Sequence, residues 1–369
     1  MSEVDVKVER LARLARAEGV GGILLNSQPN FAWLTGGRSN GIDGSREPGA
    51  GSLLVSDRGE RFVMANNIEM PRLVDEALAD LEFVPCEYHW TAEQADPGQA
   101  IATARRAVGG REVACDGAMG GGKPIEPKIA AARALLTDAE VARYRALGRD
   151  MGRVLGLFCR TLTPGLQERE IATRLASAVL DADARPIVTM VAADERIDRY
   201  RHPVPTSRAW RSRALLVVCA QRDGLIVSLS RMVMAGHPTD DVMCRMSATA
   251  QVFERLVQAT RPAATGAELF AVAVQAYREA GYPSEETRHH QGGAVGYRSR
   301  EWLAHPRSRD VVQRQQAFAW NPSMTGTKVE DTVLLVDGHL ELITASPAWP
   351  ALPIRVNGQP LPAAAPLLI

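Results

Sequence analysis

The sequence predicts an α/β domain over residues 1–127 and an α+β domain over residues 128–369. First, the 369 residues exceed the length at which one hydrophobic core usually stops growing, so two domains are expected. Second, strand-like apolar runs alternate with helical segments in the first third of the chain, whereas long helices and antiparallel-type strands follow. Third, a run rich in glycine and proline at 117–127 separates the two patterns and is the expected linker.

The amino-terminal domain opens with a predicted amphipathic helix from Val4 to Glu18. Apolar residues recur there at helical spacing, and Gly19 follows as a stop signal. Strands and helices then alternate, which is typical of an α/β domain. The remaining strands are expected at 22–25, 52–56, 61–65, 83–86 and 112–115, and the helices at 68–78 and 93–108.

The second domain opens with a long helix through Arg160, for which Thr137 and Asp138 resemble a cap. A second helix at 167–181 follows the turn at Pro164 and Gly165. The pattern of helices around a mostly antiparallel sheet predicts an α+β domain. Further strands are expected at 186–191, 214–219, 225–230, 318–320 and 329–336, with helices at 241–259 and 266–280.

Charge and composition exclude several classes of partner. The chain has 43 basic and 43 acidic residues, so there is no electrostatic argument for nucleic acid or an anionic membrane as the main partner. No apolar run approaches the length of a membrane span, and we expect a cytoplasmic protein. The five cysteines are widely spaced with no CxxC pair, so we expect them reduced, with Cys219 in the core.

The densest concentration of chemistry is the stretch 288–302, which reads RHHQGGAVGYRSREW. Gly292, Gly293 and Gly296 remove side chains where the backbone would pass close to another strand or a ligand, and the neighbouring imidazoles and amide supply hydrogen-bonding groups. This pattern predicts the floor of a pocket. The alternative is a glycine-rich hairpin whose histidines are solvated or bonded to backbone carbonyls.

Three other segments of the second domain also gather polar side chains, at 200–203, 222–231 and 321–331. Their order along the chain resembles the pita-bread family, which includes creatinase, aminopeptidase P and methionine aminopeptidase. The resemblance covers nearly the whole length, through NFAWLTGG at 30–37, YRHPVPT at 200–206, DGLIVSLSR at 223–231 and GTKVEDTVLL at 326–335. It implies a creatinase-like amino-terminal domain and a pita-bread catalytic-type domain.

The metallopeptidases of that family hold two divalent metals with two Asp, one His and two Glu. Carried onto this chain, those positions fall at Val217, Ser228, Gly293, Asn321 and Glu330, so that only Glu330 keeps a ligand carboxylate. Hard divalent cations require several anionic oxygens. The sequence therefore predicts that the metal site is lost and that the protein uses no metal and no other cofactor.

Creatinase, in the same family, acts on a C–N bond without metal, and its acid/base histidine matches His202. A neutral imidazole near pH 7 can act as general base and then as general acid. We expect Glu330 to orient His202 or to bind an ammonium or guanidinium group, and His290 to help as a donor. The expected substrate-binding residues are Arg298, His289, Gln291, Asn321, Ser228, Tyr200 and Arg201. Two ion pairs are also expected, Arg231 with Asp331 and Arg300 with Glu301 at the rim.

The leading hypothesis is thus a metal-independent, creatinase-like hydrolase of a small amino acid, amide or guanidino compound. One alternative is a binding or regulatory protein that keeps the shape and has lost catalysis. The other is an Xaa-Pro aminopeptidase-type metallopeptidase with altered ligands, for example His289, His290, Glu330 and Asp223. The expected partners are a small-molecule substrate and a second copy in a homodimer, because family members are often dimers with shared sites.

Overall fold

The computed structural model describes residues 1–369 and divides the chain into two compact units, Met1–Ala139 and Glu140–Ile369. The expected boundary was residue 127. The helix α6 (Glu126–Ala134) spans that point and contacts α1 (Glu3–Glu18), so the residues up to Ala139 stay with the first unit.

The first unit is built on one mixed sheet with the strand order β4-β3-β2-β1-β5-β6. Its opening helix α1 is fixed at both ends: Ser2 and Asp5 form a capping box, and Gly19 takes the left-handed conformation that ends it. The predicted α/β class is confirmed. The remaining elements are β1 (Gly22–Ser27), α2 (Gln28–Leu34), β2 (Pro48–Ser56), β3 (Arg61–Asn66), α3 (Met70–Arg72), the π-helical turn η1 (Leu73–Ala77), β4 (Val84–Tyr88), α4 (Trp90–Ala95), α5 (Gln99–Ala107), β5 (Val113–Cys115) and β6 (Lys123–Pro124).

The helix expected at 93–108, with polar breaks, is divided into two helices in the structure. Asp96, Pro97 and Gly98 separate α4 from α5, because proline cannot donate an intrahelical bond and Gly98 is the N-cap residue of the second helix. Most other expected elements lie within a few residues of those observed. The long helix α7 (Asp138–Cys159) begins and ends close to the expected positions, as does α8 (Glu168–Asp181).

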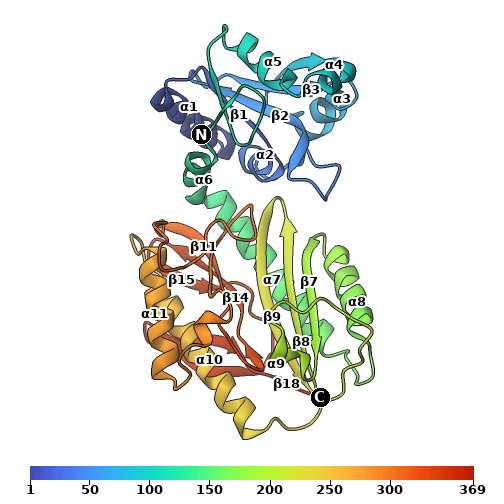
Figure 1. The fold of residues 1–369 in the computed structure, drawn as a ribbon, viewed down its shortest axis with the longest axis vertical. Coiled ribbons are helices and arrows are strands. Elements are labelled where there is room, and N and C mark those ends of the chain that lie inside the picture. The colour runs from blue at the N-terminus through green and yellow to red at the C-terminus, as the bar shows by residue number, and fades with distance from the viewer. The chain divides into compact units, whose positions relative to one another are not determined.

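The second unit contains two four-stranded sheets, ordered β18-β9-β8-β7 and β10-β11-β14-β15. Figure 1 shows α8 beside β7 and the helices α10 and α11 on the opposite side of the unit. Mixed helices and antiparallel strands confirm the predicted α+β class. The elements are β7 (Arg185–Ala193), α9 (Arg196–Arg199), β8 (Arg213–Arg222), β9 (Leu225–Met234), α10 (Asp240–Ala259), α11 (Gly266–Glu279), η2 (Glu285–Thr287), β10 (Gly292–Val295), β11 (Gln315–Trp320), β12 (Ser323–Met324), β13 (Thr327–Lys328), β14 (Asp331–Val336), β15 (His339–Leu342), β16 (Ala351–Val356), β17 (Gln359–Ala364) and β18 (Leu367–Leu368).

The two sheets of the second unit meet where β9 runs beside β14. The amide of Ser230 donates to the carbonyl of Glu330 at 3.0 Å, and the amide of Ser228 donates to the Thr332 hydroxyl at 2.8 Å. Backbone groups at this seam are therefore satisfied across the two sheets. Side chains of β9 and of the segment before β14 consequently share one polar centre.

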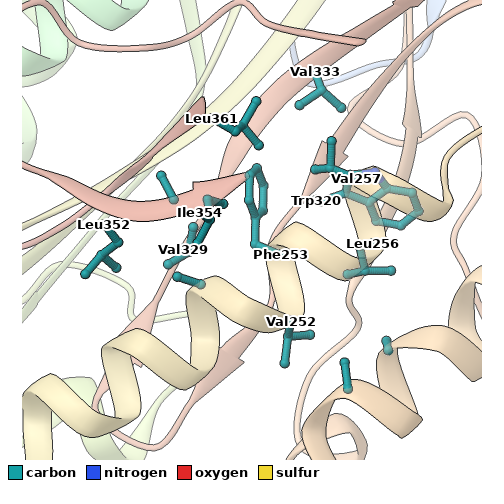
Figure 2. Packing of buried hydrophobic residues seen from close by; sticks show 14 of the residues in the cluster. Val252, Phe253, Leu256, Val257, Trp320, Val329, Val333, Leu352, Ile354 and Leu361 are labelled. Atoms are coloured by element: carbon teal, nitrogen blue, oxygen red, sulfur yellow. The ribbon is translucent and has the colours of Figure 1, made fainter. Parts of the chain in front are cut away.

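The core of this unit is closed by α10 on one side. Figure 2 shows Val252, Phe253, Leu256 and Val257 of α10 next to the β16–β17 hairpin and the central strands. Their spacing of three and four residues places them on one helical face, and all four are fully buried. This packing holds the strands that carry the polar centre. None of the helices combines the length and the apolar character needed to cross a bilayer.

Candidate functional site

Three imidazoles gather in the second unit. Nitrogen atoms of His202, His289 and His290 all lie within 4.8 Å of one another, and the two Nε2 atoms of His202 and His289 are 3.1 Å apart. The rings of His289 and His290 stack with their centroids 4.3 Å apart. His202 is exposed, whereas His289 is buried. The sequence prediction that these residues form one site is thus supported by their proximity.

Local structure holds the cluster in place. His202 follows α9 in the loop before β8, and the other two imidazoles precede β10. The Tyr277 hydroxyl donates to Oε1 of Gln291 at 2.7 Å, and Nε2 of Gln291 donates to the carbonyl of His289 at 2.5 Å. The amide of Gln291 is therefore occupied by the protein, and its expected role in reading a substrate is replaced by a role in positioning His289.

Gly292 and Gly293 lie against neighbouring backbone, as the sequence predicts, whereas Gly296 faces the side chain of Glu301. A Cβ on Gly292 would lie 2.1 Å from the carbonyl oxygen of Ala319, and one on Gly293 would lie 2.1 Å from that of Trp302. Gly292 also has φ of +100°, which favours glycine. The close approach of neighbouring backbone therefore excludes any side chain at either position without a shift of the chain.

All three imidazoles are held in the neutral form. Burial and then the Lys328 ammonium lower the pKa of His289 to about 2, and burial and then Arg300 lower that of His290 to about 4. The pKa of His202 is also lowered, first by burial and then by Lys328, while Glu330 acts in the opposite direction. Neutral rings at pH 7 have a lone pair available for a proton or a ligand.

A charged group lies beside the imidazoles. Nζ of Lys328 lies 2.8 Å from Oε2 of Glu330, and Nη2 of Arg300 lies 3.5 Å from Oε1 of the same carboxylate, which also accepts from the Ser230 hydroxyl. Burial alone would raise the pKa of Glu330, but Lys328, Arg300 and Ser230 more than offset it and lower this pKa to about 2. We call Lys328, Glu330 and Arg300 the charged triad.

Glu330 therefore does not take the role expected from sequence. Its carboxylate is 2 % exposed and is bonded to protein cations, so it neither orients His202 by a hydrogen bond nor faces an incoming ammonium. The expected ion pair of Arg300 with Glu301 is likewise wrong. Oε1 of Glu301 accepts from the amides of Tyr297 and Arg298, and the guanidinium of Arg300 turns inward to Glu330 and Ser228 instead.

The other expected substrate-binding residues differ in position. Ser228 is buried and donates to Sγ of Cys219 at 3.1 Å, with Arg300 3.4 Å away. Asn321 is buried, and its Oδ1 has no hydrogen-bond partner. Both lie at the polar centre: Ser228 is bonded to Arg300, and Asn321 follows Trp320, which pairs with Gly292 and Asp331.

Three further candidates lie at the edge of the site or outside it. Arg201 pairs with Glu285 at 2.8 Å, and Tyr200 is an exposed ring against the guanidinium of Arg196. The carbonyl of Arg298 accepts from the amide of Gly296 in the turn after β10. The guanidinium that contacts Glu330 belongs to Arg300, two residues further on.

The sequence interpretation omitted Lys328 and Ser230 and gave Arg300 only a rim role. A signal for Lys328 existed, because it stands two residues before Glu330 and alternate residues of an extended chain share a face. The inward direction of Arg300 had no such signal. It depends on the fold of the loop after β10.

The model of metallopeptidase family M24 matches residues 142–337, which is more than half of the chain. This chain belongs to family M24. Among curated relatives, it is similar to Xaa-Pro dipeptidases from Lactobacillus delbrueckii subsp. lactis, with 24% identity over 248 residues, and from Pyrococcus furiosus, with 21% over 231 residues. These matches cover 63% and 60% of this chain and 66% of each relative, which is just under two thirds of the relative's length.

Solved structures confirm the fold. The dipeptidase PepE from Mycobacterium ulcerans superposes with a TM-score of 0.78 and 18% identity, covering 100% of this chain and 98% of that one. The prediction of an amino-terminal domain followed by a pita-bread domain is thereby confirmed for this M24 protein.

The two-metal centre expected for family M24 does not fit the residues of this chain. Of the five ligand positions, Val217 is packed in the hydrophobic core, and a side chain at Gly293 would collide with the Trp302 carbonyl. Ser228 and Asn321 offer only neutral oxygens. Glu330 keeps a carboxylate, but this carboxylate already forms an ion pair with the Lys328 ammonium. One compensated carboxylate cannot hold two hard divalent ions.

The residues of this M24 protein that could hold a metal are the three imidazoles, as ligands of one borderline ion such as Zn²⁺. Asp223, an earlier candidate for a displaced acidic ligand, is excluded from that set. It lies exposed in the β8–β9 turn with φ of 50°. The cluster itself contains no carboxylate.

Proposed function

We propose that this M24 protein hydrolyses a C–N bond of a small amide or amino-acid derivative without the family's two-metal centre, and that His202 is its general acid and base. The observation that carries the proposal is the group of three neutral imidazoles that the exposed His202 forms with His289 and His290. Of the five positions at which the family's metal ligands are expected, Glu330 alone has an anionic side chain. An imidazole of this kind accelerates such a reaction by about a hundredfold to ten-thousandfold.

The contacts of His202 define which nitrogen would act. Because His202 and His289 meet through their Nε2 atoms, one of the two donates and the other accepts. If His202 donates, Nδ1 of His289 keeps its proton and points to the Ser323 hydroxyl 3.5 Å away. Nδ1 of His202 then carries a lone pair that no hydrogen bond within the protein uses. This tautomer suits a general base, with His289 as the positioning residue.

In the proposed reaction, Nδ1 of His202 takes a proton from water while the water oxygen bonds to the substrate carbon. The imidazolium then returns that proton to the leaving nitrogen as the C–N bond breaks, so that His202 ends neutral. His290 and Asn321 supply polar groups for the substrate, because His290 Nδ1 and Asn321 Oδ1 are both buried without a protein partner.

The deciding experiment combines elemental analysis with a hydrolysis screen of small amides and dipeptides. Metal content and turnover are measured on the purified protein before and after chelation. We expect less than a tenth of an equivalent of transition metal and turnover that chelation leaves unchanged. The metal-free proposal would be contradicted if the protein contained stoichiometric metal and its activity disappeared on chelation and returned on reloading.

A second candidate is an Xaa-Pro peptidase that uses one metal ion. The imidazole cluster favours it, since three nitrogens within 4.8 Å can bind one ion, and so do the relatives named Xaa-Pro dipeptidase. Cleavage of an Xaa-Pro dipeptide that tracks one bound equivalent of zinc would select it. If no substrate is turned over but small ligands still bind, a regulatory or binding protein is the better description.

The proposal includes a homodimer, as the resemblance to the pita-bread family implies. Light scattering on the purified chain tests it directly. A mass equal to that of the 40.0 kDa monomer across the working concentration range would remove this part of the proposal.

A further inference from the structure

The charged triad carries an excess of positive charge and has little exposure to solvent. The side chains of Lys328 and Glu330 are 4% and 2% exposed, and that of Arg300 is 17% exposed. Two cationic groups and one carboxylate leave one positive charge without a counterion. The neighbouring imidazoles are neutral and do not offset it. Buried charges are normally paired, so this excess is unusual for a purely structural group.

Polar atoms around the triad are also left without partners. An ammonium group has three donors, and the Lys328 ammonium has Glu330 as its one hydrogen-bonded partner. Arg300 bonds through Nη1 to the Ser299 carbonyl and the Ser228 hydroxyl, but its Nε is buried with no partner. Buried donors in native proteins are usually satisfied. Spare donors on both cations indicate an acceptor that arrives from outside.

The chemistry of that acceptor follows from the charges. A neutral carbonyl or a water could fill the donors but would leave the positive charge uncompensated. A carboxylate would do both, and a guanidinium in a fixed fork is well suited to bind one. By contrast, a substrate bearing an ammonium or guanidinium would have to displace Lys328 from Glu330 and add a second uncompensated charge.

We propose that Arg300 and Lys328 form a receptor for the carboxylate of the substrate, so that the protein takes an amide bearing a carboxylate and no free ammonium group. The inference rests on the proposed function for the bond that is cleaved, but binding of the anion does not depend on cleavage. It replaces the expectation that Glu330 recognises a cationic group, and it excludes guanidino compounds whose cation would occupy that carboxylate.

The test is isothermal titration calorimetry at pH 7.5 and low ionic strength with three matched probes. N-acetylglycine has the carboxylate and the amide, N-acetylglycinamide has lost the charge, and glycinamide is cationic. We expect N-acetylglycine to bind at least tenfold more tightly than either of the others. Its affinity should also fall as salt is raised, a measurement that needs no variant. Equal affinities, or a preference for glycinamide, would overturn the proposal.

Arg300→Gln should lower the affinity for N-acetylglycine at least tenfold and bring it to the level of the neutral probe. The matched control is Arg288→Gln, which removes the same charge from a side chain that is 62% exposed in the same segment; it should change affinity less than twofold. Equal effects of both substitutions would refute the assignment. Arg300→Lys keeps the charge and should retain the preference for the anion, and the melting temperature of each variant reports folding.

The outcomes separate the two proposals. Tight binding of N-acetylglycine with no hydrolysis of any amide supports the receptor and removes the proposed function. Hydrolysis of a cationic amide by a protein that does not bind N-acetylglycine supports the hydrolase and overturns the receptor.

Discussion

Glu330 and Asp331 are neighbours in the chain, yet their carboxylates have opposite surroundings. Asp331 accepts from Arg231 at 3.0 and 3.2 Å and from Thr344 at 2.7 Å, and Arg231 also donates to two backbone carbonyls and to Ser346. Glu330 lies among cations whose donors are not all used. A buried carboxylate with saturated partners supports the fold, and one whose partners have spare donors lies beside a ligand site.

The pKa values of Asp331 and Glu330 are also shifted in opposite directions. Burial raises the pKa of Asp331 despite its bonds to Arg231, whereas the pKa of Glu330 is lowered to about 2 against the effect of burial. The surplus of positive charge at Glu330 accounts for this difference.

Asp331→Asn should cause the largest loss of stability. It leaves the fully buried Arg231 guanidinium without a counterion, at a cost of about 3–5 kcal/mol in the free energy of unfolding. Urea denaturation measures the change. Asp223→Asn in the exposed β8–β9 turn is the control and should stay within about 0.5 kcal/mol. If the two substitutions cost the same, Asp331 is not the structural member of the pair.

His202→Ala should show the reverse pattern. Because His202 is exposed and bonds through one nitrogen, the unfolding free energy should change by less than about 0.5 kcal/mol. Turnover of the substrate found in the screen should fall by about a hundredfold or more. His237→Ala, at another exposed histidine, should leave kcat unchanged. A full-rate His202→Ala enzyme would exclude general acid/base catalysis by this residue.

Gly293→Ala probes the closed metal-ligand position. The new methyl group would start 2.1 Å from the Trp302 carbonyl oxygen, so the strand must shift, and overpacking of this kind costs about 1–3 kcal/mol. Gly117→Ala, where nothing lies within 4 Å, is the control. The melting temperatures of the two variants measure the difference in stability, and that of Gly293→Ala should be the lower. A neutral Gly293→Ala would mean that a histidine could be restored there and that the ligand position is not closed.

Acid should weaken the fold in a window set by the histidines. In the folded protein, burial and then Arg300 hold the pKa of His290 at about 4, whereas the unfolded chain binds this proton below about pH 6.5. The unfolded state therefore holds more protons between these values, and stability falls as pH drops from about 6.5 towards 4. The slope is at most about 1.4 kcal/mol per pH unit for one group.

His289, with a pKa of about 2, acts in the same direction, and Glu330 adds to the loss only below about pH 4.5. His290→Gln should reduce the slope between pH 6.5 and 4 by one group, as measured by melting temperature against pH. An unchanged slope would show that His290 is not held neutral by the fold.

Much of the fold could be predicted because it depends on local pattern. Helical spacing and end signals located α1, α7 and α10, and Gly292 and Gly293 correctly indicated close backbone contact. The buried ion pair of Arg231 with Asp331 was also confirmed. Each of these follows from residues whose partners are set by strand register or helix periodicity.

The charged triad could not be assembled in the same way. Arg300 comes from the loop after β10, and its side chain can reach either the rim or the interior, so adjacency to Glu301 suggested the wrong partner. The spare donors on Lys328 and Arg300 are a property of packing alone. They become visible only when the surroundings of each nitrogen are known.

Because Lys328 pairs with Glu330, the positive charge that balances this carboxylate comes from the protein chain itself. When a metal ion balances the charge of a carboxylate, that balance depends on whether the ion is bound. It therefore changes with the concentration of free metal, with competing metals and with chelators. The counterion of Glu330 is the Lys328 ammonium, which belongs to the same polypeptide chain. Every molecule therefore carries one such counterion, always of the same kind. The charge balance of this carboxylate therefore does not vary with the supply of metal ions.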